Sequence, residues 1–330
     1  MSIRGMKRRT FIAALGGAAT WPFVARAQQA GRLARVGILT GGAEPASPLF
    51  EAFRREMRSL GYVEGRTLII EFRSAAGAND RLPELAAELV RLPVDIILTE
   101  ATPATIAAKQ ATSTIPIVMG VVADAIGPGL VDNLPRPGGN ITGFTTLGTE
   151  LESKRLDLLK EAFPAMKRVG VLAGANNPGT PIGLASTMEA ARALDLLVEV
   201  AKAETRADIP GALDRLKDSG VSALDVISNS VFFNEHKLIV LLVTAKRLPA
   251  IYGDAVFPEA GGLMSYGPEV RDNFRRAAGY VDRILKGAKA GELPVEQPTK
   301  FELIINLGAA KAIGVTLPSA LVLRADKVIE

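Results

Sequence analysis

The sequence predicts an α/β fold of two Rossmann-like lobes, each with a parallel sheet, joined by crossover hinges. Short runs rich in Val, Ile and Leu alternate with longer helical patterns, which is typical of parallel sheets covered by helices on both faces. A Pro- and Gly-rich segment separates two such stretches, and RVGILTGG at 35–42 is nearly repeated as RVGVLAGA at 168–175. Because about 300 residues exceed what one hydrophobic core usually serves, these observations favour two similar lobes.

The first 27 residues have the order of an export signal. A basic front with Arg8 and Arg9 precedes an uncharged segment at 11–24, which is shorter than the roughly 20 residues that cross a bilayer as a helix. An Ala-Arg-Ala triplet then provides a cleavage site near Ala27 and Gln28. The arginine pair resembles a twin-arginine signal, with the general secretory route as the alternative. We therefore expect residues 1–27 to be a signal peptide and the mature protein to reside in the periplasm.

Removing the signal changes the charge balance. The chain has 39 Lys and Arg and 35 Asp and Glu; residues 1–27 contain five of the basic residues and no acidic one, so the mature chain carries 34 against 35, a net charge of −1. This balance gives no support for a nucleic-acid partner. With no Cys and a single His, His236, the chain has neither a disulfide framework nor the ligands of a typical zinc site. We expect no metal and no cofactor.

The first stretch after the signal predicts four strands with helices between them. Each strand is apolar along its whole length, as in a sheet buried on both faces, and Phe50, Phe53, Met57 and Leu60 follow helical spacing in the first helix. The predicted strands are 35–40, 67–72, 94–99 and 115–121, and the predicted helices are 47–60, 82–91 and 103–111.

The segment DNLPRPGGNITGF then marks a break, after which the alternation resumes. The predicted helices are 151–162, 181–194, 209–218 and 233–248, and the predicted strands are 168–172, 196–201, 223–227 and 250–252. After Gly261-Gly262 a tail predicts strands at 263–266 and 301–305 with helices at 271–285 and 309–313. Because this tail is too short for a third domain, we expect it to complete the first two. Lobe 1 would comprise 28–145 plus about 263–290, and lobe 2 would comprise 146–262 plus about 291–330.

Signatures of common enzymes are absent from the sequence. The first strand–helix turn, at 40–45, lacks the GxGxxG spacing of a dinucleotide fold. The segment at 174–180 resembles the start of a phosphate loop but lacks its lysine, and no GxSxG nucleophile elbow occurs. A Ser/His/Asp triad would need His236, which lies inside a predicted helix rather than at a strand end. We expect a protein that is not an enzyme.

Small polar residues gather instead at the carboxyl ends of the predicted strands, where open α/β sheets bind ligands. Two facing rims of this kind predict a cleft that closes on a small molecule. For any single residue, ordinary capping or turn chemistry is the alternative. The candidate binding residues are Gly41, Ser47, Glu100, Thr102, Thr105, Asn177, Asn229, Phe232, Tyr252, Asp254 and Tyr266.

These candidates fit a small ligand with a carboxylate, such as an amino acid or an aromatic acid. Ser47, Thr102 and Thr105 stand near helix starts, where hydroxyls and free N–H groups hold anions. Glu100 and Asp254 end strands of opposite lobes and would hold an ammonium group, unless Glu100 pairs with a neighbouring Lys or Arg. Tyr252, Tyr266 and Phe232 would stack on an aromatic portion, Asn177 and Asn229 would orient the ligand, and Gly41 lies in the first turn.

Several longer stretches resemble one known family. LTEATPATIAAKQATSTIPIVMGVV, LVDNLPRPGGNITGF, EAGGLMSYGPEV and LPVEQPTKFELIINLGAAKAIGVTLP are similar to ABC transporter substrate-binding proteins of the tryptophan and tyrosine type. The chain departs from the usual pattern at Glu100, at 124–126 and at 228–230, so the ligand of a relative does not transfer directly.

The resemblance implies a type-I periplasmic-binding fold and a role in delivering a small molecule to membrane permease and ATPase subunits. We therefore expect an extracytoplasmic solute-binding protein that acts as a monomer. A ligand-sensing module with a separate signalling partner is the main alternative, and an exported enzyme is the other. Neither a membrane span nor a helix-turn-helix accompanies the predicted lobes, so a sensor would need a second protein.

Overall fold

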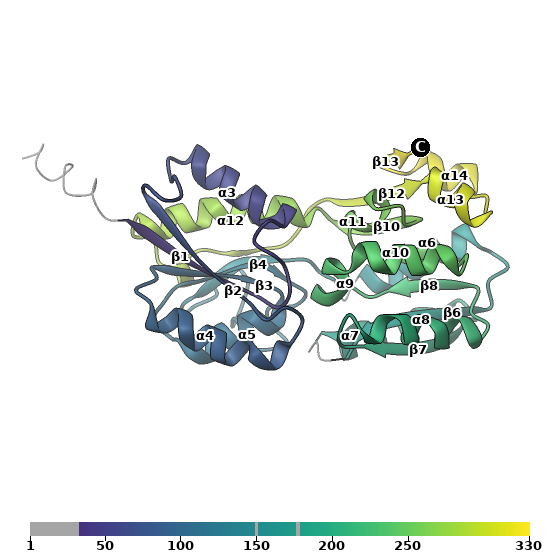
Figure 1. Cartoon of the computed structure of the whole chain (residues 1–330), viewed down its shortest axis with the longest axis horizontal. Coiled ribbons are helices and arrows are strands. Elements are labelled where there is room, and N and C mark those ends of the chain that lie inside the picture. The colour runs from purple at the N-terminus through teal and green to yellow at the C-terminus, as the bar shows by residue number, and fades with distance from the viewer. Residues whose placement is uncertain (1–32, 149–150, 176–178) are drawn as a thin grey trace, which may run out of the picture.

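The computed structural model describes residues 33–148, 151–175 and 179–330. It shows two α/β lobes side by side, joined by extended segments (Figure 1). Both sheets consist mostly of parallel strands, which confirms the predicted fold class. The predicted signal peptide at 1–27 and the candidate Asn177 lie outside the described residues. None of the described helices combines the length and the apolar character that crossing a bilayer requires.

The first sheet has six parallel strands in the order β11-β5-β4-β3-β1-β2. Its strands are β1 (Ala34–Thr40), β2 (Leu68–Ser74), β3 (Ile96–Glu100), β4 (Ile117–Val122), β5 (Ile141–Thr145) and β11 (Val295–Glu296). Its helices are α3 (Pro48–Ser59), η1 (Asn79–Arg81), α4 (Leu82–Arg91), α5 (Thr102–Ala111), α12 (Val270–Leu285) and η2 (Ala290–Glu292). In Figure 1, α3 and α12 cover one face of this sheet, and α4 and α5 cover the other.

The apolar face of α3 shows why this layer forms. Leu49, Phe50, Phe53 and Met57 recur at helical spacing and are all buried against the sheet and α12. The rings of Phe50 and Phe274 meet edge to face, with centroids 5.3 Å apart, a favoured geometry for aromatic pairs. A helix far along the chain thus completes the core of the first lobe.

The second sheet has seven strands in the order β13-β12-β10-β9-β8-β6-β7, with β12 antiparallel to β10. Its strands are β6 (Arg168–Gly174), β7 (Leu197–Ala203), β8 (Ala223–Val226), β9 (Ala250–Tyr252), β10 (Met264–Pro268), β12 (Phe301–Asn306) and β13 (Lys327–Ile329). Its helices are α6 (Leu151–Ala162), α7 (Thr180–Ala193), α8 (Asp208–Asp218), α9 (Ser230–Asn234), α10 (His236–Ala245), α11 (Val256–Glu259), α13 (Leu307–Ile313) and α14 (Ser319–Leu323).

Within the described residues the chain passes between the two sheets three times: between β5 and α6, between β10 and α12, and between β11 and β12. These crossings fall at other places than the sequence analysis expected for the tail. Strand β10 belongs to the second sheet, although about 263–290 was assigned to lobe 1, and β11 belongs to the first sheet, although about 291–330 was assigned to lobe 2.

The conformation of Gly261-Gly262 explains why β10, which follows these glycines, was assigned to the wrong lobe. These glycines end helix α11, because the N–H of Gly261 donates to the carbonyl of Pro258 and that of Gly262 to Phe257. Gly261 has φ of 100°, the left-handed conformation that glycine supplies at a helix end. The pair is therefore a helix cap within the second lobe and not a linker between lobes.

Two other sequence interpretations were wrong. The segment read as a break contains β5, a buried central strand. The single helix expected at 233–248 is two helices, α9 and α10, that meet at Glu235. In β5, Gly143 has φ of 132°, and a Cβ there would lie 2.2 Å from the carbonyl oxygen of Met119. The glycine that suggested a loop is required by close strand packing.

Candidate functional site

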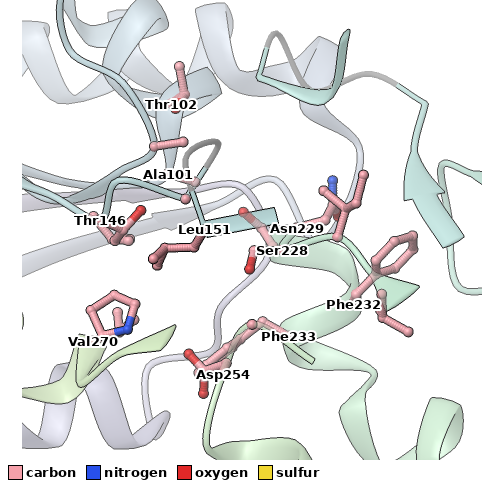
Figure 2. Close-up of a pocket in the computed structure, with 18 of the residues that line it drawn as sticks. Ala101, Thr102, Thr146, Leu151, Ser228, Asn229, Phe232, Phe233, Asp254 and Val270 are labelled. Carbon is pink, nitrogen blue, oxygen red and sulfur yellow. The ribbon is translucent and has the colours of Figure 1, made fainter. Parts of the chain in front are cut away.

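A cavity lies between the two lobes, where the carboxyl ends of strands from both sheets meet. Its empty space is about 820 Å³, including the part open to solvent. Figure 2 shows Thr102 and Thr146 of the first lobe on one side of this cavity and Phe232 of the second lobe on another. Five of the predicted residues line it: Glu100, Thr102, Asn229, Phe232 and Asp254.

Glu100 ends β3 and is almost completely buried. Thr40 Oγ1 donates a hydrogen bond of 2.8 Å to Glu100 Oε2, and Ser230 Oγ donates one of 3.2 Å to Oε1. Burial raises the pKa of this carboxyl, while the hydrogen bonds from Thr40, Ser230 and Gly41 oppose the rise. Because Ser230 belongs to the second lobe, Glu100 connects the lobes directly.

The start of α5 faces the cavity next to Glu100. Ala101 precedes the helix with φ of 70° and ψ of 160°, a conformation that is costly for a residue other than glycine. Its side chain caps nothing, so the first N–H groups of α5 donate no hydrogen bond to a capping side chain. Ala101 and Thr102 both line the cavity. Backbone strain and an uncapped helix start therefore coincide at the predicted anion position.

Asp254 follows β9 on the second lobe and is half-buried at the cavity wall. Burial raises its pKa to about 6, and neighbouring Glu259 adds to the rise, while a hydrogen bond from the N–H of Val256 and the charge of Arg271 oppose it.

Apolar side chains form much of the remaining wall. They come from five helices: α3, α6, α9, α11 and α12. The apolar lining includes Leu49, Leu151, Phe232, Phe233, Phe257 and Val270. A cavity with a few polar groups in an apolar wall is the usual form of a small-molecule site.

Arg155 of α6 lines the cavity near the crossovers and is fully buried. Its guanidinium forms an ion pair with Glu152 and lies 3.8 Å from Asp225 Oδ1. It also donates to the carbonyls of Tyr266 at 3.2 Å and Gly148 at 3.4 Å. Burial together with the Glu152 carboxylate raises the pKa of Asp225 well above its ordinary value.

The other predicted residues lie elsewhere. Thr105 is buried inside α5, where its hydroxyl shares a hydrogen bond of 2.7 Å with Thr99. Tyr252 lies in the core, stacked on Phe257 with ring centroids 4.3 Å apart. Tyr266 packs near Phe301, and its side chain is not part of the cavity wall among the described residues.

Two further candidates lie close to the cavity without lining its described part. Ser47 precedes α3 without capping it, and its buried hydroxyl has no hydrogen-bond partner within the described residues. Gly41 lies beside the second lobe, since a Cβ built there would lie 3.7 Å from Ser230. Gly41 thus permits the close approach of α9 to the end of β1.

The list of candidate binding residues omitted Arg155, Ser228, Ser230 and Phe233, which line the cavity, although the polar run at 228–230 was noted at a strand end. Glu152 and Arg155 fall on the buried face of α6, together with Leu151, Leu156 and Leu159. Charged residues three apart on an apolar helix face are the signal that could have found this pair. Ser228 and Ser230 flank the predicted residue Asn229, and Phe233 follows the predicted residue Phe232.

Within the described ranges, no group of three or more His, Cys, Asp or Glu side chains is arranged to hold a metal ion. The polar groups that line the cavity are hydroxyls, an amide, two carboxyls and one arginine. This set can bind an ammonium group, a carboxylate and a hydroxyl by charge-assisted hydrogen bonds.

Comparisons with known proteins agree with this geometry. A family model described as "ABC transporter substrate binding protein" matches residues 49–329. The chain is 26% identical over 270 residues to a "Tyrosine-binding protein" of Clostridioides difficile strain R20291, which covers 82% of this chain and 77% of that protein.

Two solved structures share the fold over nearly their whole length. A conserved domain protein of Vibrio cholerae has a TM-score of 0.82 and 26% identity, covering 90% of this chain and 100% of that one. An ABC domain from Streptococcus pneumonia in complex with L-Trp has a TM-score of 0.79 and 24% identity, covering 89% of this chain and 100% of that one.

Proposed function

Because the chain belongs to the ABC transporter substrate-binding protein family, we propose that it is the extracytoplasmic binding protein of an ABC importer. Its ligand is an amino acid with an apolar or aromatic side chain. The observation that supports this ligand is the composition of one cavity, in which acids from both lobes, an uncapped helix start and an apolar wall lie together. These groups complement an ammonium group, a carboxylate and a hydrophobic side chain respectively.

Glu100 and Asp254 are the proposed ammonium ligands. Both are cavity acids with raised pKa values, so a cation beside them would relieve an electrostatic penalty. The proposed carboxylate site is the start of α5, where Thr102 offers a hydroxyl and the helix dipole favours an anion. Phe232 and Phe233 would contact the hydrophobic part of the ligand.

Movement of the lobes is part of the proposal. The hydrogen bond from Ser230 to Glu100 spans the cleft, and a ligand held by Glu100 and Asp254 would bridge the lobes in the same way. The segments between the sheets would serve as hinges. The proposed role in import has two consequences. The mature protein is released into the periplasm, and it docks on permease and ATPase subunits.

The relatives are substrate-binding proteins, and a binding role without catalysis is proposed for this chain as well. We propose that lobe 1 runs from 28 to about 145 and that lobe 2 begins at 146. In the tail, β11 belongs to lobe 1, and β10, β12 and β13 belong to lobe 2. A single copy carries both halves of the cavity, so we propose that the protein acts as a monomer.

Mass spectrometry of small molecules released from denatured protein tests the ligand class. We expect an amino acid, and we expect the same compound to raise the melting temperature in a screen of the twenty amino acids, since it binds the folded state. Isothermal titration calorimetry with L-tyrosine and L-tryptophan, chosen because the relatives above bind them by name, gives the affinity. Failure of every amino acid to bind or to raise the melting temperature would refute the proposed ligand class.

A further inference from the structure

We propose that Arg155 is a positioning residue of the hinge, which holds the second-lobe ends of two crossovers together and so restricts the arrangements that the two lobes can adopt. The two crossovers are the segment between β5 and α6, which contains Gly148, and the segment between β10 and α12. The inference rests on the lobe movement of the proposed function and adds the residue that directs this movement. Arg155 acts through backbone carbonyls and not through contact with a ligand.

The guanidinium of Arg155 connects the two crossovers. Its Nη1 donates a hydrogen bond of 3.2 Å to the carbonyl of Tyr266, two residues before the end of β10. Its Nη2 donates one of 3.4 Å to the carbonyl of Gly148, which lies between β5 and α6. Both carbonyls belong to backbone that leads from one sheet to the other. One side chain therefore holds two segments together that are far apart in the sequence.

Strand pairing already fixes the second-lobe ends of the other crossovers. Strand β10 pairs with β12 along its whole length, so the start of the β10–α12 crossover lies next to the end of the β11–β12 crossover. Gly267 of β10 also packs on backbone, since a Cβ built there would lie 2.1 Å from the carbonyl oxygen of Gly253. Gly148, by contrast, belongs to none of the strands in the described ranges. Arg155 thus attaches the first crossover to a unit that contains the ends of the other two.

The acids around Arg155 keep its guanidinium in place. Arg155 is about 1% exposed, forms an ion pair with Glu152 of its own helix, and has Asp225 of β8 3.8 Å from its Nε. The rigid, planar group of an arginine offers several N–H donors, so it can hold two carbonyls and a carboxylate at once, whereas a lysine is a single point charge. A buried ion pair often contributes less to stability than apolar residues of the same volume. Its place beside two crossovers therefore points to positioning of the hinge.

Distances between the lobes in the empty protein test the proposal. The chain contains no cysteine, so Arg58→Cys in α3 and Lys217→Cys in α8 place one spin label on an exposed position of each lobe. Double electron–electron resonance on the full mature protein then measures the distribution of distances between the labels. In Arg155→Lys, which keeps a positive charge beside Glu152 but loses the planar group, this distribution should widen by about half or more. A width equal to that of the parent protein would overturn the proposal.

Arg168→Lys is the matched control. Arg168 also pairs with a glutamate, Glu199, and donates to a carbonyl, that of Ser219, but none of these residues belongs to a crossover. We expect the width of the distribution to stay that of the parent protein in this variant. Equal widening in Arg168→Lys and Arg155→Lys would mean that the lobe itself has loosened, and it would contradict a specific role of Arg155.

A second variant decides the question where Arg155→Lys does not fold. Arg155→Met combined with Glu152→Gln removes one charge of each sign and so leaves neither of them buried alone. It should widen the distribution to the same extent, and an unchanged width in the folded double variant would also refute the role of Arg155. Circular dichroism verifies the fold of each labelled variant. Because the measurement uses no ligand, its result is separate from that of the amino-acid screen.

Discussion

Ligand affinity should depend on pH through Asp254. Its pKa is about 6 in the structure, against an ordinary value of 3.8, chiefly because of burial. The charged and titratable neighbours, Arg271 and Glu259, oppose each other, and they form a mutual ion pair of 2.6 Å. If the ammonium group of the ligand binds the ionised carboxylate, protonation of Asp254 competes with binding.

The magnitude follows from that pKa. About nine tenths of the carboxyl is ionised at pH 7 and about one tenth at pH 5, so the dissociation constant should rise about tenfold between pH 7 and pH 5. Protonation of Glu100, whose pKa is also raised, acts in the same direction. Calorimetry with L-tyrosine or L-tryptophan at both pH values measures the change, and buffers of different ionisation enthalpy report proton release.

The empty protein should show the opposite trend in stability. A carboxyl with a raised pKa in the folded state contributes stability below its unfolded pKa, and that contribution is lost as the pH rises through the folded pKa. From pH 4 to pH 6, Asp254 should therefore lower the free energy of unfolding by at most about 2 kcal/mol. Because the carboxyl is half-buried, the measured loss should be smaller.

Asp254→Asn should reduce both pH effects. Asp214→Asn is the control, since Asp214 lies in an exposed ion pair with Lys246 of the same lobe. An affinity that is independent of pH in the parent protein, or a pH dependence unchanged in Asp254→Asn, would refute the role of Asp254 as an ammonium ligand.

Four further results are expected. Ser230→Ala removes the hydrogen bond between the lobes and should weaken calorimetric ligand affinity about fivefold, or about 1 kcal/mol; unchanged affinity contradicts this. Gly143→Ala should cost at least about 3 kcal/mol in urea unfolding, because its Cβ would meet Met119, whereas Gly279→Ala, with open space around it, should not. The radius of gyration from X-ray scattering should fall on ligand binding, and an equal value with and without ligand argues against closure. Replacing Arg8 and Arg9 by Lys should leave precursor in the cytoplasm, as fractionation and N-terminal sequencing would show; normal export argues for the general route.

The fold was predictable where a strand is apolar on both faces. The run that became β3 is buried along its whole length and the one that became β1 at every position except Arg35, and a covered parallel sheet accommodates such runs. Strand β5 was missed because its glycine serves a tight strand contact, which a sequence cannot distinguish from a loop glycine. Strand β11 has two residues, too few for any periodicity.

The site was predictable where a polar residue ends a strand or closely follows one. Glu100 is the last residue of β3, Asp254 lies two residues after the end of β9, and both line the cavity. Tyr252 is only two residues earlier, but it still belongs to β9 and its ring packs in the core against Phe257, whereas Asp254 lies beyond the strand end. Arg155 was missed because it comes from a helix, and its role depends on which carbonyls the crossovers bring to it.

The buried acids give a physical reason for the ligand to control closure. Closing the lobes without a ligand leaves Glu100 and Asp254 in a cavity with apolar walls, and their raised pKa values record the cost of ionising them there. An ammonium group supplies the missing counter-charge only in the closed arrangement, where acids of both lobes reach it, and this difference in affinity is what shifts the equilibrium. We infer that a plain carboxylic acid, which brings no cation, would bind without closing the lobes.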